Sequence, residues 1–282
     1  MPKTTILTLR EKKARGERMT FLTAYDYPFA MLEQKAGIDV ILVGDSMGMV
    51  IFGYNSTLPV TVDLMMPHVK AVRLGAPDVY LVGDMPYMSY QVSIPEAIRN
   101  GGRFMAEADC DAVKLEGGRE VADTIRAMVN ATIPVMGHMG LTPQSVAQLG
   151  GYKAQGRDIA TATRLIEDAA ILEEAGVSSL LLEAVPAEVA RIITRRASVP
   201  VFGIGAGPHC DGQVLVIHDM LGMFDRAPKF VKKYKEIGAQ ILEGLTEFKK
   251  EVAEGAFPAT QHCYPMPADV AEELEKLYPP KA

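Results

Sequence analysis

The sequence predicts an α/β protein folded as a single (β/α)8 TIM barrel. Three observations favour this fold: short apolar runs recur eight times along the 282 residues, helical patterns separate them, and polar residues follow most of the runs. The alternative is an open doubly wound sheet, which normally has a glycine-rich turn after its first strand. Here the segment Ala24-Tyr-Asp-Tyr-Pro-Phe29 occupies that place and contains no glycine.

The predicted strands are apolar and rich in β-branched residues, as expected of strands buried on both faces. The string Leu-Val-Gly-Asp closes two of these runs, at 42–45 and at 81–84. We predict the eight strands at Thr20–Tyr25, Val40–Asp45, Val79–Asp84, Ala112–Glu116, Val135–Met139, Ser179–Ala184, Val201–Ile204 and Val214–His218.

Helical patterns fill several of the intervals. Apolar residues at helical spacing predict a helix over Asp63–Leu74, and Ser93-Ile-Pro-Glu96 is a capping-box pattern that opens a helix ending near Ala108. A third apolar stripe runs from Asp158 to Ala175 and stops at Gly176. No linker or domain boundary is visible, so residues 1–282 are expected to form one domain. The proline-rich stretch 255–282 is expected to be a C-terminal tail.

Composition excludes several classes of protein. Net charge is −6, which argues against a nucleic-acid partner. The three cysteines lack the number and spacing of a disulfide framework or zinc site, which fits a reducing cytoplasm. The first twenty residues do not resemble a secretory signal, and no window approaches the length of a membrane span, so no membrane partner is expected.

Acidic residues close three successive predicted strands. In a barrel of this kind, Asp45, Asp84 and Glu116 would meet at the C-terminal face, where such folds carry their sites. Three neighbouring carboxylates repel one another unless a cation lies between them, and oxygen ligands suit Mg²⁺. The alternative is that these acids cap the following helices. For three acids in successive units, we favour a metal site.

Other polar residues are expected at the same face. Period-two alternation directs Lys114 and Glu116 into the barrel, where Lys114 either forms a structural ion pair or binds a substrate carboxylate. Glu183 ends the sixth strand, across the mouth from the acids, and is a candidate general base or an exposed junction residue. His138 could bind a substrate oxygen or another carboxylate, or serve a structural role.

Longer strings surround these residues, at Met19–Tyr27, Leu42–Met49, Val82–Pro86, Ala112–Gly118, Pro134–Gln144, Leu182–Glu183 and Gly203–Gly207. Together they resemble the ketopantoate hydroxymethyltransferase family over nearly the whole chain. The resemblance implies a (β/α)8 barrel that transfers a hydroxymethyl group from 5,10-methylenetetrahydrofolate to 3-methyl-2-oxobutanoate, giving 2-dehydropantoate in pantothenate biosynthesis. It also implies a cytoplasmic homo-oligomer, commonly a decamer.

The resemblance also implies roles for individual residues. Asp45 and Asp84 match the ligands of Mg²⁺, and Glu116 matches a position that serves the metal site. Chelation of the oxo acid would stabilise its enolate, and Glu183 matches the position that transfers the proton. The positions that contact the oxo acid are matched by Asp45, Ser46, Asp84 and Lys114.

Two other interpretations remain at this point. A Mg²⁺-dependent carbon–carbon lyase or phosphonomutase would use the same acids and the same enolate but would need no folate. A non-catalytic barrel that binds a metabolite would be expected to have lost some of these residues, and here all of them are present.

Overall fold

Eight parallel strands form a closed barrel in the computed structural model, which describes residues 2–280. Each strand pairs with its neighbours in sequence, and β8 pairs with β1 to close the ring, so the predicted (β/α)8 barrel is confirmed. The strands are β1 (Met19–Thr23), β2 (Val40–Val43), β3 (Tyr80–Asp84), β4 (Ala112–Glu116), β5 (Val135–Gly140), β6 (Ser179–Glu183), β7 (Val201–Ile204) and β8 (Gly212–Leu215).

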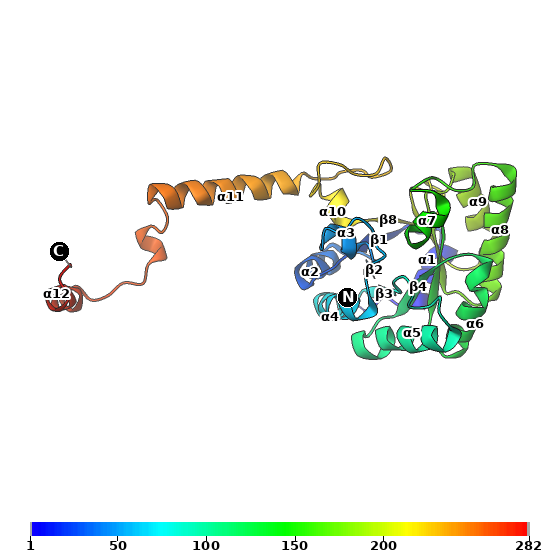
Figure 1. The fold of residues 1–282 in the computed structure, drawn as a ribbon, viewed down its shortest axis with the longest axis horizontal. Coiled ribbons are helices and arrows are strands. Elements are labelled where there is room, and N and C mark those ends of the chain that lie inside the picture. The colour runs from blue at the N-terminus through cyan, green and yellow to red at the C-terminus, as the bar shows by residue number, and fades with distance from the viewer. Residues whose placement is uncertain (1, 281–282) are drawn as a thin grey trace.

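Helices surround most of the barrel (Figure 1). The longer ones that pack around it are α2 (Tyr27–Ala36), α4 (Val62–Gly75), α5 (Ile94–Ala108), α6 (Ala122–Asn130), α8 (Ile159–Glu174) and α9 (Ala187–Arg196). Short elements in the loops are α3 (Met47–Val50), α7 (Val146–Leu149), α10 (Ile217–Met220), η1 (Arg119–Val121) and η2 (Pro143–Ser145). The three helices predicted from the sequence correspond to α4, α5 and α8.

Helix α1 (Ile6–Ala14) closes the N-terminal end of the barrel. Its Leu9 is fully buried among the side chains that fill the barrel interior. Lys12 and Lys13 form ion pairs with Asp39 and Asp211, which immediately precede β2 and β8. The opposite end of the barrel is therefore the open one, as expected for a site at the C-terminal ends of the strands.

Strand alternation separates two hydrophobic cores. Residues such as Phe21, Val82 and Phe202 fill the barrel interior, whereas Val113 and Leu115 pack in the layer between strands and helices. The residue between the latter two, Lys114, therefore points inward, as the alternation predicted.

The prediction for the eighth strand is wrong in position. The strand ends at Leu215, and the residues predicted to complete it form helix α10 instead. The backbone amide of Ile217 donates to Thr23 Oγ1 at 3.1 Å, which ties the start of α10 to the end of β1. His218 and Asp219 consequently lie on a helix and not at a strand tip.

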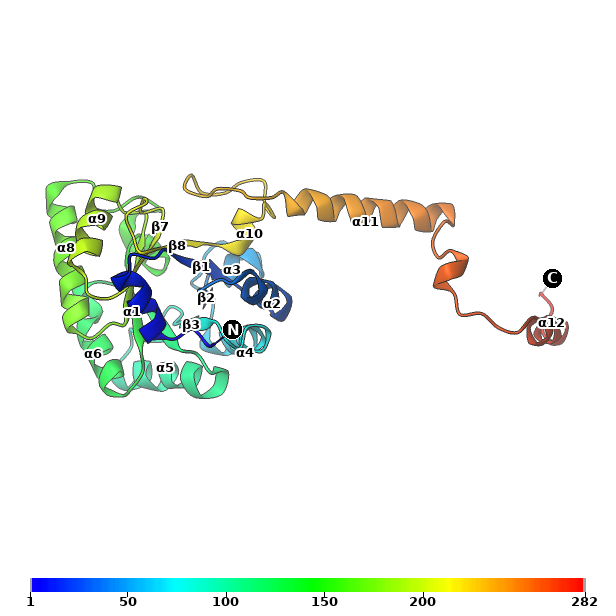
Figure 2. The same ribbon diagram turned by 180° about the vertical axis from the view of Figure 1, so that it is seen from behind.

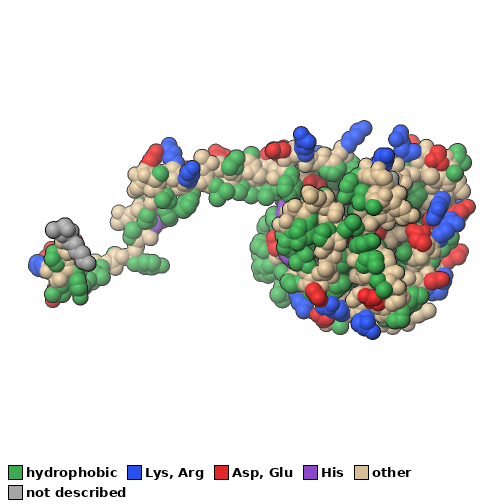
Figure 3. All heavy atoms as spheres, in the orientation of Figure 1, with side chains coloured by type: hydrophobic (Ala, Val, Ile, Leu, Met, Phe, Trp, Pro, Cys, Tyr) green, Lys and Arg blue, Asp and Glu red, His purple; other side chains and the backbone are tan. Residues whose placement is uncertain are grey.

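The C-terminal segment stands off the barrel. Helix α11 (Ile237–Glu254) has no buried residue and points away from the strands, followed by η3 (Thr260–His262) and α12 (Ala268–Leu277) (Figures 1 and 2). The segment outside the barrel thus begins before residue 255, the predicted start of the tail. Figure 3 shows hydrophobic side chains along this helix. Among residues 2–280, no helix combines the length and the apolar character that a membrane crossing requires.

Candidate active site

Three buried carboxylates meet at the C-terminal ends of β2, β3 and β4. Asp84 and Glu116 are the last residues of β3 and β4, and Asp45 lies two residues beyond β2. The exposed fraction of each residue is 5% or less. None of the three caps a helix: the N-cap of α3 is Ser46, which makes no side-chain cap, and no helix begins directly after Asp84 or Glu116.

Each of these acids has one oxygen fixed by a protein donor. The Asp45 backbone amide donates to Asp84 Oδ2, and the Gln144 amides donate to Glu116 Oε2 and Asp45 Oδ2, all at 2.9 Å. The remaining oxygens of Asp84 and Glu116 face the ammonium group of Lys114, at 2.8 and 3.6 Å. Asp84 Oδ1 nevertheless receives no well-aligned hydrogen bond.

The acids differ in their electrostatic surroundings. Burial raises the pKa of Asp45 well above its usual range, and the nearby charges of Asp84 and Glu116 raise it further. Burial also raises the pKa of Asp84, although Lys114 opposes this effect. For Glu116, burial is outweighed by the positive charge of Lys114 and by His138, and its pKa is lowered.

Lys114 is buried within this cluster. Burial alone would lower its pKa, but Asp84, Glu116 and Asp45 together raise it above the usual range. Lys114 Nζ also lies 3.1 Å from His138 Nδ1. The interpretation of Lys114 as a member of a buried ion pair is confirmed by these contacts, and its role toward a substrate stays a prediction.

His138 lies between two carboxylates. Its Nδ1 is 3.5 Å from Glu116 Oε1, and its Nε2 is 3.3 Å from Glu183 Oε2 without the alignment of a hydrogen bond. Burial and Lys114 would lower the pKa of His138, but the two carboxylates raise it to about 9. The histidine therefore connects the acid cluster of β2–β4 with Glu183 at the end of β6.

Ser46 is held in place beside the acids. Its Oγ lies 2.8 Å from Tyr25 Oη, and Tyr25 is itself buried after β1. Gly44 leaves room for the Ser46 hydroxyl in this orientation, because a Cβ at that position would lie 2.7 Å from Ser46 Oγ. The Gly-Asp-Ser sequence thus brings Asp45 and Ser46 to the same edge of the barrel.

The donor set fits a divalent cation in its chemistry. Three carboxylates lie with one lysine and one histidine, and burial raises the pKa values of Asp45 and Asp84, so keeping both ionised calls for positive charge beside them. Carboxylate oxygens are the ligands that Mg²⁺ prefers. In the described part of the chain, no three histidine, cysteine or acidic side chains converge closely enough to form a metal cage by themselves. In this structure the positive groups among the acids are the Lys114 ammonium and the His138 ring, whose pKa is raised to about 9.

Two buried residues of the site were missed in the sequence. Gln144 in η2 contacts two of the acids, and the Tyr90 hydroxyl lies 2.8 Å from Gln144 Oε1 and 3.0 Å from the Glu116 carbonyl oxygen. Both lie in loops, where no periodicity marks an inward-facing side chain. The only signal was the position of Gln144 within the string Pro134–Gln144.

Other polar residues near the strand ends do not join the cluster. Asp26 caps α2, because its Oδ1 accepts a hydrogen bond from the Phe29 amide at 2.9 Å. His218 packs against the rings of Tyr25, Phe29 and Phe224. Asp26 therefore serves as a helix cap and takes no part in the acid cluster.

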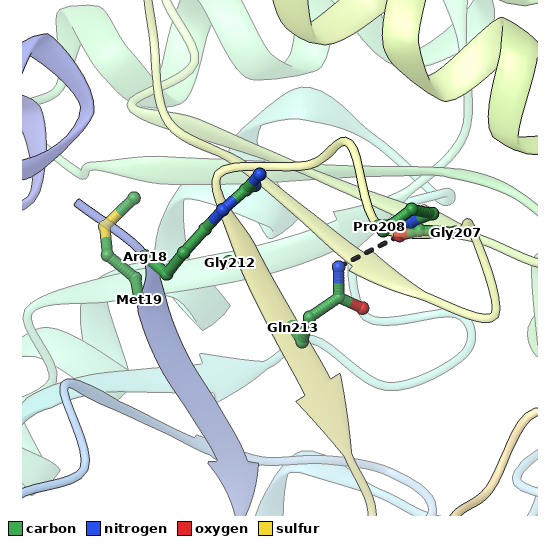
Figure 4. Close-up of a pocket in the computed structure, with 6 residues that line it drawn as sticks. All are labelled: Arg18, Met19, Gly207, Pro208, Gly212 and Gln213. Carbon is green, nitrogen blue, oxygen red and sulfur yellow. Dashed lines mark hydrogen bonds between the residues drawn. The ribbon is translucent and has the colours of Figure 1, made fainter. Parts of the chain in front are cut away.

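Two cavities lie outside the acid cluster. The first, of about 450 Å³, is lined by Arg18, Met19, Gly207, Pro208, Gly212 and Gln213, near the N-terminal ends of β1 and β8 (Figure 4). It is therefore remote from the acids. The second, of about 390 Å³, is lined in part by Gly117, Met139, Gly140 and residues of α8.

A closed (β/α)8 barrel that buries acids, a lysine and a histidine at the C-terminal ends of its strands has the architecture of a barrel enzyme for a small substrate. Sequence comparison identifies the family of this enzyme: the sequence model of the ketopantoate hydroxymethyltransferase family matches residues 3–260. The chain belongs to this family.

Relatives from bacteria match over almost the full length. The chain is 54% identical to the 3-methyl-2-oxobutanoate hydroxymethyltransferase of Syntrophomonas wolfei over 279 residues, which cover 99% of this chain and 100% of the relative. It is also 54% identical to the protein of the same name from Moorella thermoacetica, over 92% of this chain and 97% of the relative.

Solved structures share the fold at low sequence identity. Phosphonopyruvate hydrolase, crystallised with oxalate and Mg²⁺, superposes with a TM-score of 0.62 at 12% identity and covers 99% of both chains. 2,3-Dimethylmalate lyase gives a TM-score of 0.59 at 16% identity, over 97% of this chain and 98% of that chain. At these low identities, the similarity shows that the chains share the barrel fold.

Proposed function

We propose that this chain transfers a hydroxymethyl group from 5,10-methylenetetrahydrofolate to 3-methyl-2-oxobutanoate, giving 2-dehydropantoate for pantothenate synthesis. The observation that carries the proposal is an intact cluster of polar residues at the barrel mouth, in a chain 54% identical to enzymes named for this reaction. The cluster consists of Asp45, Ser46, Asp84, Lys114, Glu116, His138 and Glu183.

Asp45 and Asp84 are the proposed ligands of Mg²⁺, with Glu116 beside them. When bound there, the cation would polarise the keto group of the oxo acid and make its C3–H bond more acidic. Burial of the acids supports this assignment, since water competes poorly for a cation in a site of this kind.

Lys114 and Ser46 are proposed to bind the oxo acid. The lysine is charged and buried, so it can offset the negative charge of a carboxylate that enters the cluster. The hydroxyl of Ser46 is oriented by Tyr25 and can donate to a substrate oxygen. His138 is proposed as a further contact to the substrate.

Glu183 is proposed to remove the C3 proton. It lies on β6, and its side chain is 17% exposed, more than the acids on β3 and β4. It stands on β6 beside His138, whereas the proposed metal ligands stand at the ends of β2 and β3, so Glu183 can act as the base from a different side of the barrel mouth. Water adds to the methylene carbon of the folate, and the C–N bonds break as tetrahydrofolate leaves, so that the carbon is released at the oxidation level of formaldehyde. The enolate carbon then attacks this one-carbon unit, whose oxygen takes up a proton and becomes the hydroxyl of the product.

The reaction assay tests this proposal directly. We expect 2-dehydropantoate to form only when the oxo acid, methylenetetrahydrofolate and a divalent cation are all present. Turnover of an oxo acid without folate would instead favour the lyase or phosphonomutase alternative. Tight binding of the oxo acid without any turnover would favour a metabolite-binding barrel.

We also propose that the chain is a cytoplasmic homo-oligomer, assembled as a decamer. Its three cysteines form no disulfide, which agrees with a reducing compartment. Exposed apolar residues on α11, including Ile241, Leu245, Phe248 and Val252, follow the spacing of one helix face and support self-association. Sedimentation should give ten times the 30.6 kDa mass of the chain, and a monomer would contradict the proposal.

A further inference from the structure

Gln144 is the residue that joins two of the acids. It lies in η2 after β5 and is 5% exposed. Its backbone amide donates to Glu116 Oε2, and its side-chain Nε2 donates to Asp45 Oδ2, both at 2.9 Å. A single residue from the loop after β5 therefore contacts acids that lie at the ends of β2 and β4.

The direction of the Gln144 side-chain amide follows from its partners. Nε2 faces the backbone oxygen of Met85, which can only accept a hydrogen bond. It also faces Asp45 Oδ2, which can only accept one when the aspartate is ionised. Oε1 faces the hydroxyl of Tyr90 at 2.8 Å and the side-chain amide of Gln91 at 3.2 Å, and both of these groups can donate. A flipped amide would set an oxygen against two acceptors, so these four partners select one orientation.

Tyr90 has a fixed place in this arrangement. It is buried, and its hydroxyl accepts a hydrogen bond from the Glu116 backbone amide at 3.2 Å. The single hydroxyl hydrogen has two acceptors within reach, Gln144 Oε1 at 2.8 Å and the Glu116 carbonyl oxygen at 3.0 Å. The hydroxyl is thereby tied to the strand that carries Glu116. Tyr90, Gln144, Asp45 and Glu116 form one continuous network.

We propose that Gln144 is a positioning residue for the metal site and that Tyr90 fixes the direction of its amide. The inference rests on the proposed function, in which Asp45 and Glu116 serve a divalent cation. Because Gln144 engages Oδ2 of Asp45 and Oε2 of Glu116, it would hold both side chains in the orientations from which they serve the cation. Carboxylates held in one rotamer lose less conformational entropy when they bind a metal.

The test is a titration of the purified full-length protein with Mn²⁺ alone, with free Mn²⁺ followed by electron paramagnetic resonance. Gln144→Leu keeps the shape of the side chain and its backbone amide but removes the donor to Asp45. We expect this variant to raise the Kd for Mn²⁺ about tenfold or more, in line with losses of groups that orient metal ligands. Gln148→Leu is the matched control: it is an exposed glutamine one helical turn further along and should bind Mn²⁺ as the wild type does.

Tyr90→Phe provides a second, milder variant. The amide of Gln144 remains but loses the donor that fixes its direction, so we expect a smaller rise in the Kd, of several-fold. Adding Tyr90→Phe to Gln144→Leu should weaken Mn²⁺ binding no further than Gln144→Leu alone, because both act through the same amide. For Gln144→Leu, higher Mg²⁺ should restore deuterium exchange at C3 of the oxo acid, an effect that a general loss of folding would not produce.

Several outcomes would overturn this role. These are wild-type affinity for Mn²⁺ in folded Gln144→Leu, additive losses in the double variant, and an equal loss in Gln148→Leu. If Gln144→Leu does not fold, wild-type affinity in Tyr90→Phe decides against the proposal. If the wild-type protein itself binds no Mn²⁺, the proposed metal site fails, and the positioning role fails with it.

Discussion

The backbone amide of Asp45 donates to Asp84 Oδ2 at 2.9 Å, so the two aspartates that close the repeated Leu-Val-Gly-Asp strings are hydrogen-bonded to each other. Because both side chains are buried, two ionised carboxylates at this place would repel each other strongly unless a cation lay nearby.

Asp84→Ala should therefore raise the Mg²⁺ requirement of the enzyme steeply. Loss of a ligand should weaken metal affinity by about 100-fold or more, beyond the losses typical of groups that only orient ligands. A titration of activity against Mg²⁺ measures the effect, and Asp225→Ala, an exposed aspartate far along the chain, is the control. An unchanged titration would reject Asp84 as a ligand.

Glu183→Gln should abolish proton removal from the substrate while leaving the metal site intact. The amide retains the size of the side chain but cannot accept the proton, so we expect exchange of the C3 proton with deuterated solvent to fall by about 10²–10⁴-fold. Nuclear magnetic resonance of the oxo acid follows the exchange, and Mn²⁺ titration checks the metal. Undiminished exchange would remove Glu183 from this role.

His138→Asn should slow the same exchange by acting on Glu183. Because His138 Nε2 lies 3.3 Å from Glu183 Oε2, the two residues are expected to act as a unit. Adding His138→Asn to Glu183→Gln should then cost little beyond Glu183→Gln alone. Fully multiplied losses in the double variant would show that the two side chains act independently.

Lys114→Met should destabilise the protein and do so more at pH 8 than at pH 5. Without the ammonium, buried Asp84 and Glu116 have lost their cation, which typically costs about 3–5 kcal/mol. At lower pH, protonation of the acids relieves part of this loss. Thermal unfolding at both pH values measures it, with exposed Lys35→Met as the control, and an equal loss at both pH values would contradict this explanation.

Glu33→Gln should stabilise the protein at alkaline pH. Glu33 is buried on α2, neither of its carboxyl oxygens has a partner, and burial raises its pKa to about 9, with a further contribution from Asp26. Between its usual pKa and 9, the folded state binds more protons than the unfolded state, so the free energy of unfolding of the wild type falls as pH rises. The limiting slope is about 1.4 kcal/mol per pH unit.

The neutral glutamine removes this dependence. The variant should match the wild type near pH 4.5 and exceed it at pH 8, with a gain on the order of a few kcal/mol. Denaturant unfolding across this range measures the difference. Exposed Glu247→Gln should leave the profile unchanged, and a parallel profile for Glu33→Gln would show that Glu33 titrates normally in the folded protein.

The barrel was predictable because buried strands leave a strong apolar signal. Alternation also correctly directed Lys114 inward between Val113 and Leu115. The end of the eighth strand was not predictable, since the apolar run 214–217 carries no mark where strand becomes helix. Boundaries inside such runs depend on tertiary contacts, here the hydrogen bond from Ile217 to Thr23.

In the candidate site, too, some residues could be predicted from the sequence pattern and others depend on tertiary contacts. Asp26 directly follows the first predicted strand, and the structure shows that it caps helix α2, which has a proline in its first turn. Gln144 could not be singled out, because its role depends on a fold that brings loop 143–145 against β2 and β4. Residues at or just beyond the strand ends were therefore accessible to pattern reasoning, and residues further into the loops, such as Gln144, were not.

The proposed tasks are divided between two halves of the chain: cation capture falls to β2–β4, and proton removal to β6. Sequence changes after β5 could therefore redirect the chemistry without disturbing the cation, provided that Gln144 is kept. Such independence offers a physical route by which barrels of one architecture could diversify, with one half inherited nearly unaltered and the other free to acquire a new reaction.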